Sequence, residues 1–103
     1  YHVYKGGSSA DSLKMVSAQG MHVIHFNDYP KNPPRQAIND SQRIFPGDGI
    51  APISQILQTL HTNGNHSHLS LELFNPTYWK QEPSVVLAAG IAKMRAAVCK
   101  AMG

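Results

Sequence analysis

Apolar residues recur along the chain at two spacings, one typical of strands and one typical of helices. Short apolar runs over residues 22–27 and 69–74 alternate with polar residues, which predicts two half-buried strands. Residues 53–60 place isoleucine and leucine at intervals of three and four, which predicts one apolar helix face. A last helix is expected to start at Pro83, a residue suited to a first helical turn, and to run through Val98. The pattern therefore predicts strands that alternate with helices.

The first twenty residues carry weaker signals of the same kind. We expect a short extended segment at residues 2–4, a turn at Gly6 and Gly7, and a short helix that ends near Gly20. The predicted order is then strand, helix, strand, long loop, helix, strand, loop, helix. Such alternation indicates parallel strands joined by right-handed crossovers, so the chain is predicted to have an α/β fold.

The loop at residues 28–52 is unusually long and contains five of the seven prolines. Loops of more than about 12 to 15 residues without regular structure are uncommon and often functional. Both longer loops of the chain follow strands, whereas the links from helix to strand are short. In a parallel α/β fold this asymmetry indicates a functional site at the carboxyl ends of the strands.

Each of the two clearest strands carries an ionisable group. His25 lies in the first, and Glu72 lies between Leu71 and Leu73 in the second. A carboxylate among leucines needs a cation, a metal or a raised pKa. His25 and Glu72, with further oxygen donors, would suit Mn²⁺, Co²⁺, Zn²⁺ or Mg²⁺. The alternative is a hydrogen-bonded core histidine and an ion pair between Glu72 and Arg43.

Three further residues are candidates for the same site. His2 belongs to the first expected strand, so that three strands would each supply an ionisable group. Asp28 begins the long loop and either orients a ligand or caps the loop backbone. Arg43 precedes the tight turn at residues 46–49, where a fixed arginine can hold a substrate oxygen or phosphate. The alternative for Arg43 is a solvated loop arginine.

Composition excludes several classes of protein. The chain has 103 residues and a net charge of +3, with its basic residues scattered, so we expect no nucleic-acid partner. A single cysteine excludes an internal disulfide and a multi-cysteine zinc site. The longest apolar run is too short to span a membrane, and no secretory signal is visible, so we expect no membrane partner and a cytoplasmic location. The chain begins at Tyr1, which suggests processing or a longer parent chain.

The segments VIHFNDYP, RIFPGDGIAPISQILQTL and LSLELF resemble the sugar phosphate isomerase/epimerase family, the xylose-isomerase-like TIM barrels. In that family the seventh strand ends in His with an acidic residue three positions on. An Arg and a Pro-Gly-x-Gly turn follow, and the last strand ends in a metal-binding Glu. The resemblance implies that residues 1–103 form the C-terminal three β/α units of a single TIM (β/α)8 barrel domain, with the N-terminal part absent from this chain.

The resemblance also implies a chemistry. It implies a divalent metal, with manganese first and cobalt, zinc or magnesium as other candidates. His25 and Glu72 match two of the four metal ligands, and the other two have no match here. His2 and Arg43 match residues that contact substrate oxygens, and Glu72 matches a glutamate that transfers a proton. The implied activity is isomerisation or epimerisation of a keto sugar, a sugar phosphate or a related polyol through a metal-stabilised enediolate, with the isolated chain expected to be inactive.

Other functions remain open on the same resemblance. Dehydratases of keto sugars or shikimate-type acids share the barrel and the metal. AP endonucleases of the superfamily use an extra Asp-x-His pair of zinc ligands, and here Ser41 and Arg43 stand at the matching positions, which argues against a nuclease. A non-catalytic binding protein is a third class. The expected partner is a small-molecule sugar or sugar phosphate, and a homo-oligomer is left open.

Overall fold

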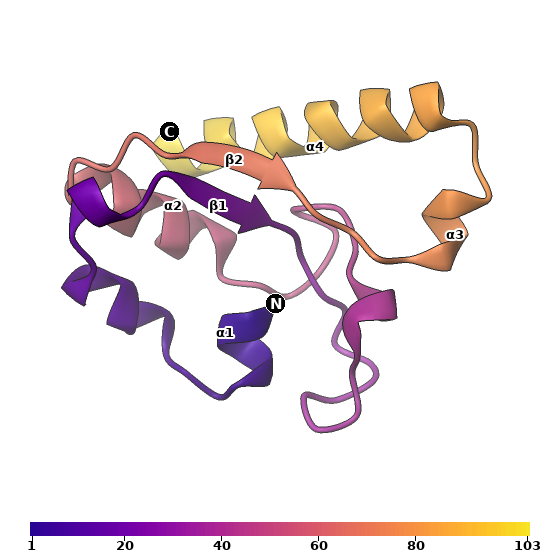
Figure 1. The fold of residues 1–103 in the computed structure, drawn as a ribbon, viewed down its shortest axis with the longest axis horizontal. Helices are drawn as coiled ribbons and strands as arrows, with labels where there is room; N and C mark the ends of the chain where they lie inside the picture. The colour runs from indigo at the N-terminus through magenta and orange to yellow at the C-terminus, as the bar shows by residue number, and fades with distance from the viewer.

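Two short parallel strands form the centre of the computed structural model, which describes residues 1–103 (Figure 1). They are β1 (Val23–Phe26) and β2 (His68–Leu71). Ile24 lies opposite Leu69 and Phe26 opposite Leu71, with the strands pointing in the same direction. The chain passes from β1 to β2 through a long loop and the helix α2 (Ile53–Thr62). The prediction of an α/β fold with parallel strands is confirmed.

Two helices bury the apolar side of this sheet. α2 buries Ile53, Leu57 and Leu60, as the spacing of its apolar residues predicts. The last helix, α4 (Pro83–Met102), packs against α2 and extends past β2. The core joins both helices to β1 and consists of Phe26, Ile53, Leu57, Ala97 and Ala101.

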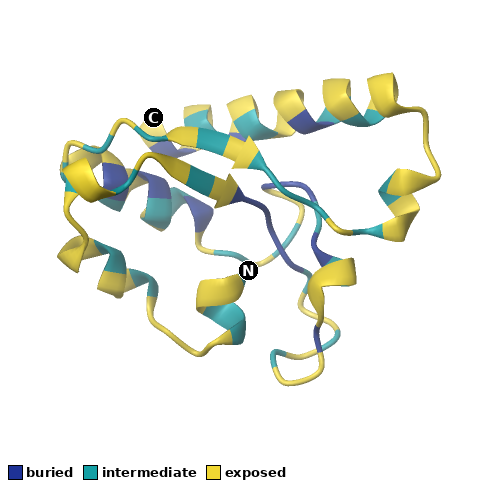
Figure 2. Ribbon diagram, viewed as in Figure 1, coloured by how far each residue is buried: buried dark blue, intermediate teal, exposed yellow.

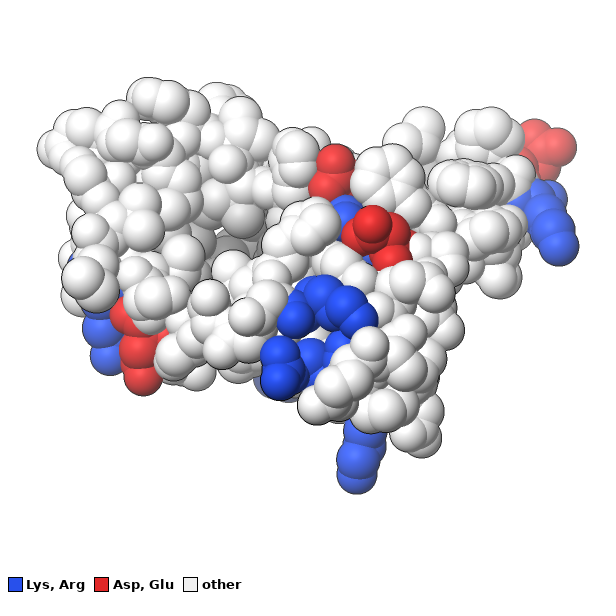
Figure 3. Space-filling model, turned by 60° about the horizontal axis from the view of Figure 1, so that its bottom comes forward, with Lys and Arg blue, Asp and Glu red and all other residues white.

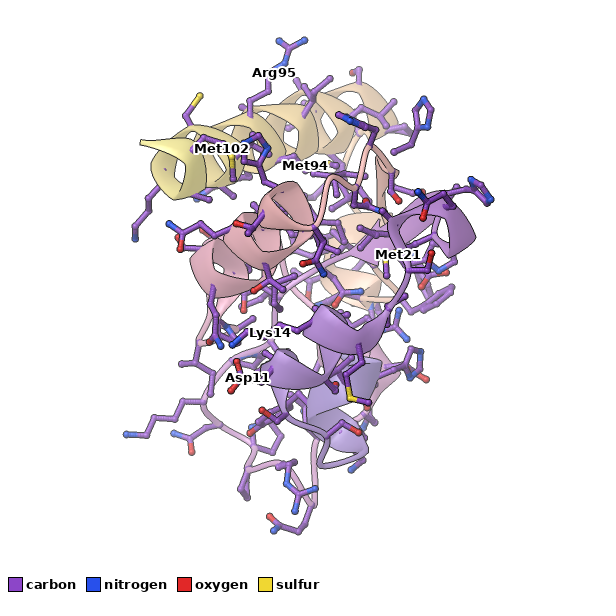
Figure 4. All side chains as sticks on the ribbon, turned by 90° about the vertical axis from the view of Figure 1, so that its left-hand side faces the viewer. Asp11, Lys14, Met21, Met94, Arg95 and Met102 are labelled. Carbon is purple, nitrogen blue, oxygen red and sulfur yellow. The ribbon has the colours of Figure 1, made fainter.

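Small residues on α4 allow it to lie close to the sheet. Gly90 is buried, and a Cβ atom at this position would lie 2.5 Å from Cδ2 of Leu71. Met94 packs against the core, whereas Arg95 is exposed and points away from the body of the protein (Figure 4). None of the helices combines the length and hydropathy needed to cross a bilayer.

The N-terminal segment differs from the prediction. Residues 2–4 do not form a strand but lie in a short helix, α1 (His2–Lys5). A strand at this position would need a neighbour for its backbone groups, whereas the helical turn bonds internally, from Lys5 N–H to the Tyr1 carbonyl at 2.8 Å. The expected helix near Gly20 is present as two 3₁₀ helices, η1 (Ala10–Met15) and η2 (Ala18–Gly20). The sheet therefore has two strands rather than three.

The long loop after β1 is closed at its base by a backbone bridge. Asp28 and Ile44 exchange two hydrogen bonds, with N···O distances of 2.9 and 3.0 Å. Between them lies the 3₁₀ helix η3 (Asp40–Gln42). After β2 the chain forms α3 (Pro76–Trp79), which is capped by the side chain of Asn75. Both connections lie at the carboxyl ends of the strands, as the loop lengths predict (Figure 1).

Large apolar surfaces remain uncovered beside the sheet. Buried residues concentrate at the end of β1 and on the inner sides of α2 and α4, while much of the strands is exposed (Figure 2). A hollow of about 650 Å³ lies beside β1 and is lined mainly by apolar residues of the N-terminal segment and α2. A second hollow, of about 770 Å³, lies between β2 and α4. Each strand has only one paired edge.

Candidate active site

The polar residues of the two strands meet at the carboxyl end of the sheet. Alternation along β1 directs Phe26 into the core and leaves His25 exposed. Glu72 follows β2 directly, and its N–H donates to the Phe26 carbonyl at 3.3 Å, which continues the pairing of the strands. As a result, Nδ1 of His25 lies 3.0 Å from Oε2 of Glu72.

Arg43 joins this pair from the long loop. Its Nη1 donates to Oε2 of Glu72 at 2.9 Å. Its Nη2 lies 2.9 Å from Nε2 of His2 and also donates to Oδ1 of Asp40. The structure thus brings together four residues singled out in the sequence, His2, His25, Arg43 and Glu72. It also contains the Glu72–Arg43 ion pair that was the alternative to a metal ligand.

The guanidinium of Arg43 is enclosed on all sides. The residue is only 1% exposed, and its Cζ lies 4.7 Å from the ring centre of Tyr1 and 5.0 Å from that of Phe74. Its Nε is buried without a hydrogen-bond partner. Arg43 is therefore not a solvated loop arginine, and the structure turns it toward protein groups rather than toward solution.

Asp40 is a member of the cluster that the sequence did not single out. Its side chain is 55% exposed and pairs with Arg43 three residues later. A capping box holds η3, in which the side chain of Asn39 accepts from the Ser41 N–H and that of Gln42 accepts from the Asn39 N–H, both at 3.0 Å. The signals in the sequence were this cap and the i, i+3 spacing of Asp40 and Arg43, and both are common on surfaces.

Asp28 binds the backbone of the long loop and does not contact the other site residues. Its buried carboxylate accepts four backbone N–H groups, at distances of 2.8 to 3.0 Å, from Tyr29, Gly47, Gly49 and Ala51. A Cβ at position 49 would lie 2.1 Å from the Tyr29 carbonyl oxygen, so this approach of the turn requires glycine. Of the two interpretations of Asp28, the structure shows the loop cap.

Burial changes the acidity of two groups next to the cluster. Burial raises the pKa of the Tyr29 hydroxyl to about 12, and the negative charge of Asp28 adds to this effect. Burial also raises the pKa of the Tyr1 hydroxyl, and the negative charge of Asp40 adds to this effect.

The side chains of His25 and Glu72 are of types that bind divalent cations, but they are only two. An imidazole and a carboxylate that face each other at 3.0 Å are ligands of the kind that Zn²⁺ and Mn²⁺ accept. No group of three or more His, Cys, Asp or Glu residues in the chain is arranged to hold a metal. His25 and Glu72 thus supply two groups of a suitable type, and the chain arranges no third group beside them to complete a metal site. Charged side chains of both signs gather near the middle of the face seen in Figure 3.

Comparisons with known proteins identify relatives that are longer than this chain. No family model matches it. Over 80 residues it is 31% identical to an inosose isomerase of Bacillus licheniformis, 30% to that of Bacillus subtilis and 28% to that of Halalkalibacterium halodurans. Each alignment covers 78% of this chain and 28% of the relative. The chain thus spans less than a third of the length of the curated relatives it matches.

Solved structures show the same arrangement of elements. The crystal structure of an IolI protein with a bound zinc atom matches 96% of this chain with a TM-score of 0.88 and 26% identity. A xylose isomerase domain protein from Alicyclobacillus acidocaldarius matches all of it with a TM-score of 0.82 and 22% identity, which is a likeness of fold. The matches cover 35% and 36% of those chains.

Proposed function

We propose that this chain is about a third of a xylose-isomerase-like TIM barrel related to the inosose isomerases, and that it carries part of the active site of a sugar isomerase or epimerase. The observation that carries the proposal is the 3.0 Å approach of His25 to Glu72 at the carboxyl ends of two parallel strands. Functional sites of TIM barrels lie at this end of the strands.

The proposal places these residues in a larger barrel. Residues 1–103 would form the C-terminal part of one barrel domain, with two more metal ligands, a Glu and an Asp, supplied by residues outside this chain. A zinc atom is bound in the IolI structure, and the family resemblance suggests manganese as the cation in use. A bound divalent cation would polarise a sugar carbonyl as a Lewis acid and hold two neighbouring sugar oxygens.

Glu72 is proposed to transfer the proton. The contact of His25 and the hydrogen bond from Arg43 both fall on Oε2 of Glu72, so the other oxygen of the carboxylate has no partner in the protein. That oxygen can accept a proton from the carbon next to a carbonyl and return one to the neighbouring carbon, which are the two steps of isomerisation. In epimerisation, a second acid, the other glutamate implied by the family resemblance, would return a proton to the other face of the same carbon.

His2 is proposed to contact a sugar oxygen. Arginine has only donors, so Nε2 of His2 must accept the bond from Nη2 of Arg43. A neutral His2 then carries its proton on Nδ1, where it is a hydrogen-bond donor. Arg43 was expected to contact substrate as well, and its burial favours a role behind the site.

The main test of the proposal replaces Glu72 by glutamine in the full-length protein. Glu72→Gln removes the base and keeps nearly the same shape, so exchange of the sugar's carbon-bound proton with deuterated water should fall by about 10² to 10⁴-fold. Proton NMR of a keto sugar measures this exchange. The matched control is Glu82→Gln, at an exposed position just before α4, which should exchange at the rate of the unmodified protein.

The outcome also separates the proposed reaction from its alternatives. Exchange at the normal rate in Glu72→Gln, with metal still bound, would contradict a role of Glu72 as acid or base. Loss of water from the sugar would instead indicate a keto-sugar dehydratase on the same barrel. In a metal titration, His25→Ala should weaken binding, and unchanged binding would remove His25 from the ligand set. His68→Ala, an exposed histidine at the opposite end of the strands, is the control.

A further inference from the structure

Arg43 lies between two carboxylates and shares its charge between them. Nη1 donates to Glu72 and Nη2 donates to Asp40. The three side chains together carry one more negative than positive charge. If Asp40 were neutral, the Arg43–Glu72 pair would carry no net charge, although it lies next to the imidazole of His25.

The burial of Arg43 strengthens the effect of its charge on Glu72. Its 1% exposure leaves little water to screen the charge, and the rings of Tyr1 and Phe74 cover the guanidinium. Asp40 is more than half exposed, so it can approach Arg43 without the cost of full burial. Its backbone is fixed by the cap at Asn39 and by the bond from the Arg43 N–H to the Asp40 carbonyl.

We propose that Asp40 is a positioning residue that acts through Arg43, because it offsets the arginine charge and leaves the negative charge of Glu72 available to a cation. The inference rests on the cation site of the proposed function and deepens it. Asp40 itself does not touch the cation or the sugar. Its role is to keep Arg43 from neutralising Glu72 while Arg43 still orients the carboxylate.

The test measures Zn²⁺ affinity of the full-length protein by calorimetric titration. Asp40→Asn keeps the shape of the side chain and removes its charge, and zinc should bind about tenfold more weakly or worse, as is typical when an outer partner of a metal ligand is lost. Asp48→Asn is the matched control, since it removes the same charge from the same loop, where Asp48 pairs with Lys93. Zinc affinity should hardly change in this control.

A third variant separates charge from structure. Asp40→Glu keeps the negative charge and should retain most of the affinity, with thermal unfolding recorded for all variants. Equal affinities of Asp40→Asn and Asp48→Asn would overturn the inference, as would an Asp40→Glu protein that is folded but binds zinc as weakly as Asp40→Asn. If Asp40→Asn does not fold, Asp40→Ser, which also removes the charge, takes its place in both comparisons.

The inference and the proposed function can fail separately. If the unmodified protein binds no zinc, the cation site is absent and the inference is overturned. If it binds zinc with the expected dependence on Asp40 but exchanges no sugar proton, the inference stands and the proposed reaction fails.

Discussion

The buried carboxylate of Asp28 is balanced by backbone groups rather than by a cation. It is 1% exposed, and each of its oxygens accepts two N–H groups of the chain. Hydrogen bonds to an ionised acceptor are shorter and stronger than neutral ones. One side chain thereby fixes the start of the long loop and the turn that follows Arg43.

Asp28→Asn should destabilise the protein strongly although the two side chains have nearly the same shape. An amide NH₂ would replace an oxygen that accepts two N–H groups, so two bonds are lost and donors face donors. We expect unfolding to be easier by about 3 kcal/mol or more, measured by urea denaturation. Asp48→Asn, which removes an exposed carboxylate from the same loop, should cost about 1 kcal/mol or less. Similar costs for both variants would contradict the role given to Asp28.

Sequence reasoning at this scale found residues whose polarity conflicts with their surroundings. His25 and Glu72 interrupt apolar strands, and the period of two residues places both on one side of the sheet. Asp40 conflicts with nothing, because an exposed aspartate in a polar loop is ordinary. Its ion pair with Arg43 is seen only in the folded loop, because the i, i+3 spacing of the two residues does not indicate that Arg43 is buried.

At the scale of elements, prediction succeeded where an element packs against another and failed where it does not. α2 buries a regular apolar face, α4 packs its small residues against α2 and the sheet, and both helices lie where the sequence predicts them. α1 is a four-residue segment with no buried residue, beside an unpaired edge of β1. Such a segment has no packing to impose an extended form, so local hydrogen bonds decide its conformation.

The contact of α4 with β2 depends on the absence of a side chain at position 90. A Cβ there would lie 2.5 Å from Leu71 Cδ2 and 3.4 Å from Phe45 Cε1. Gly90→Val should therefore reduce stability by about 1 to 3 kcal/mol through overpacking, measured by chemical denaturation. Ala88→Val, at an exposed position of the same helix, should cost less than about 1 kcal/mol. If Gly90→Val is as stable as this control, the close approach of the helix is not needed.

At the scale of the whole molecule, the sheet is too small to cover its own surroundings. Two strands with one free edge each border hollows of about 650 and 770 Å³ lined mostly by apolar residues. Val23, at the free edge, is 54% exposed. Exposed strand edges next to apolar surface favour association with other chains.

The 103-residue chain on its own should therefore associate or exchange its amide protons rapidly. Analytical ultracentrifugation over a range of concentrations should show oligomers, and hydrogen exchange should show weak protection of the strands. Val23→Lys should reduce association more than Val85→Lys, because Val85 is equally exposed but borders neither hollow. A stable, well-protected monomer would contradict this prediction.

The sequence predicted best those elements whose packing partners lie within this chain. The parallel pair of strands, α2 and α4 follow from residues that pack against each other here. The third expected strand depended on a partner that the structure does not provide, so its segment adopts another conformation. The sequence likewise predicts only two metal ligands, His25 and Glu72, and the structure arranges no group of three or more such residues to hold a metal.

The bridge between Asp28 and Ile44 has an evolutionary consequence. It holds together the two ends of the loop formed by residues 29–43. Part of the loop before η3 can therefore change in length while Arg43 keeps its hydrogen bond to Glu72. The entropic cost of lengthening a closed loop rises only slowly with its length. Residues 31–34, at the exposed tip of this loop, are thus a region where insertions could change the surface beside the carboxyl ends of the strands.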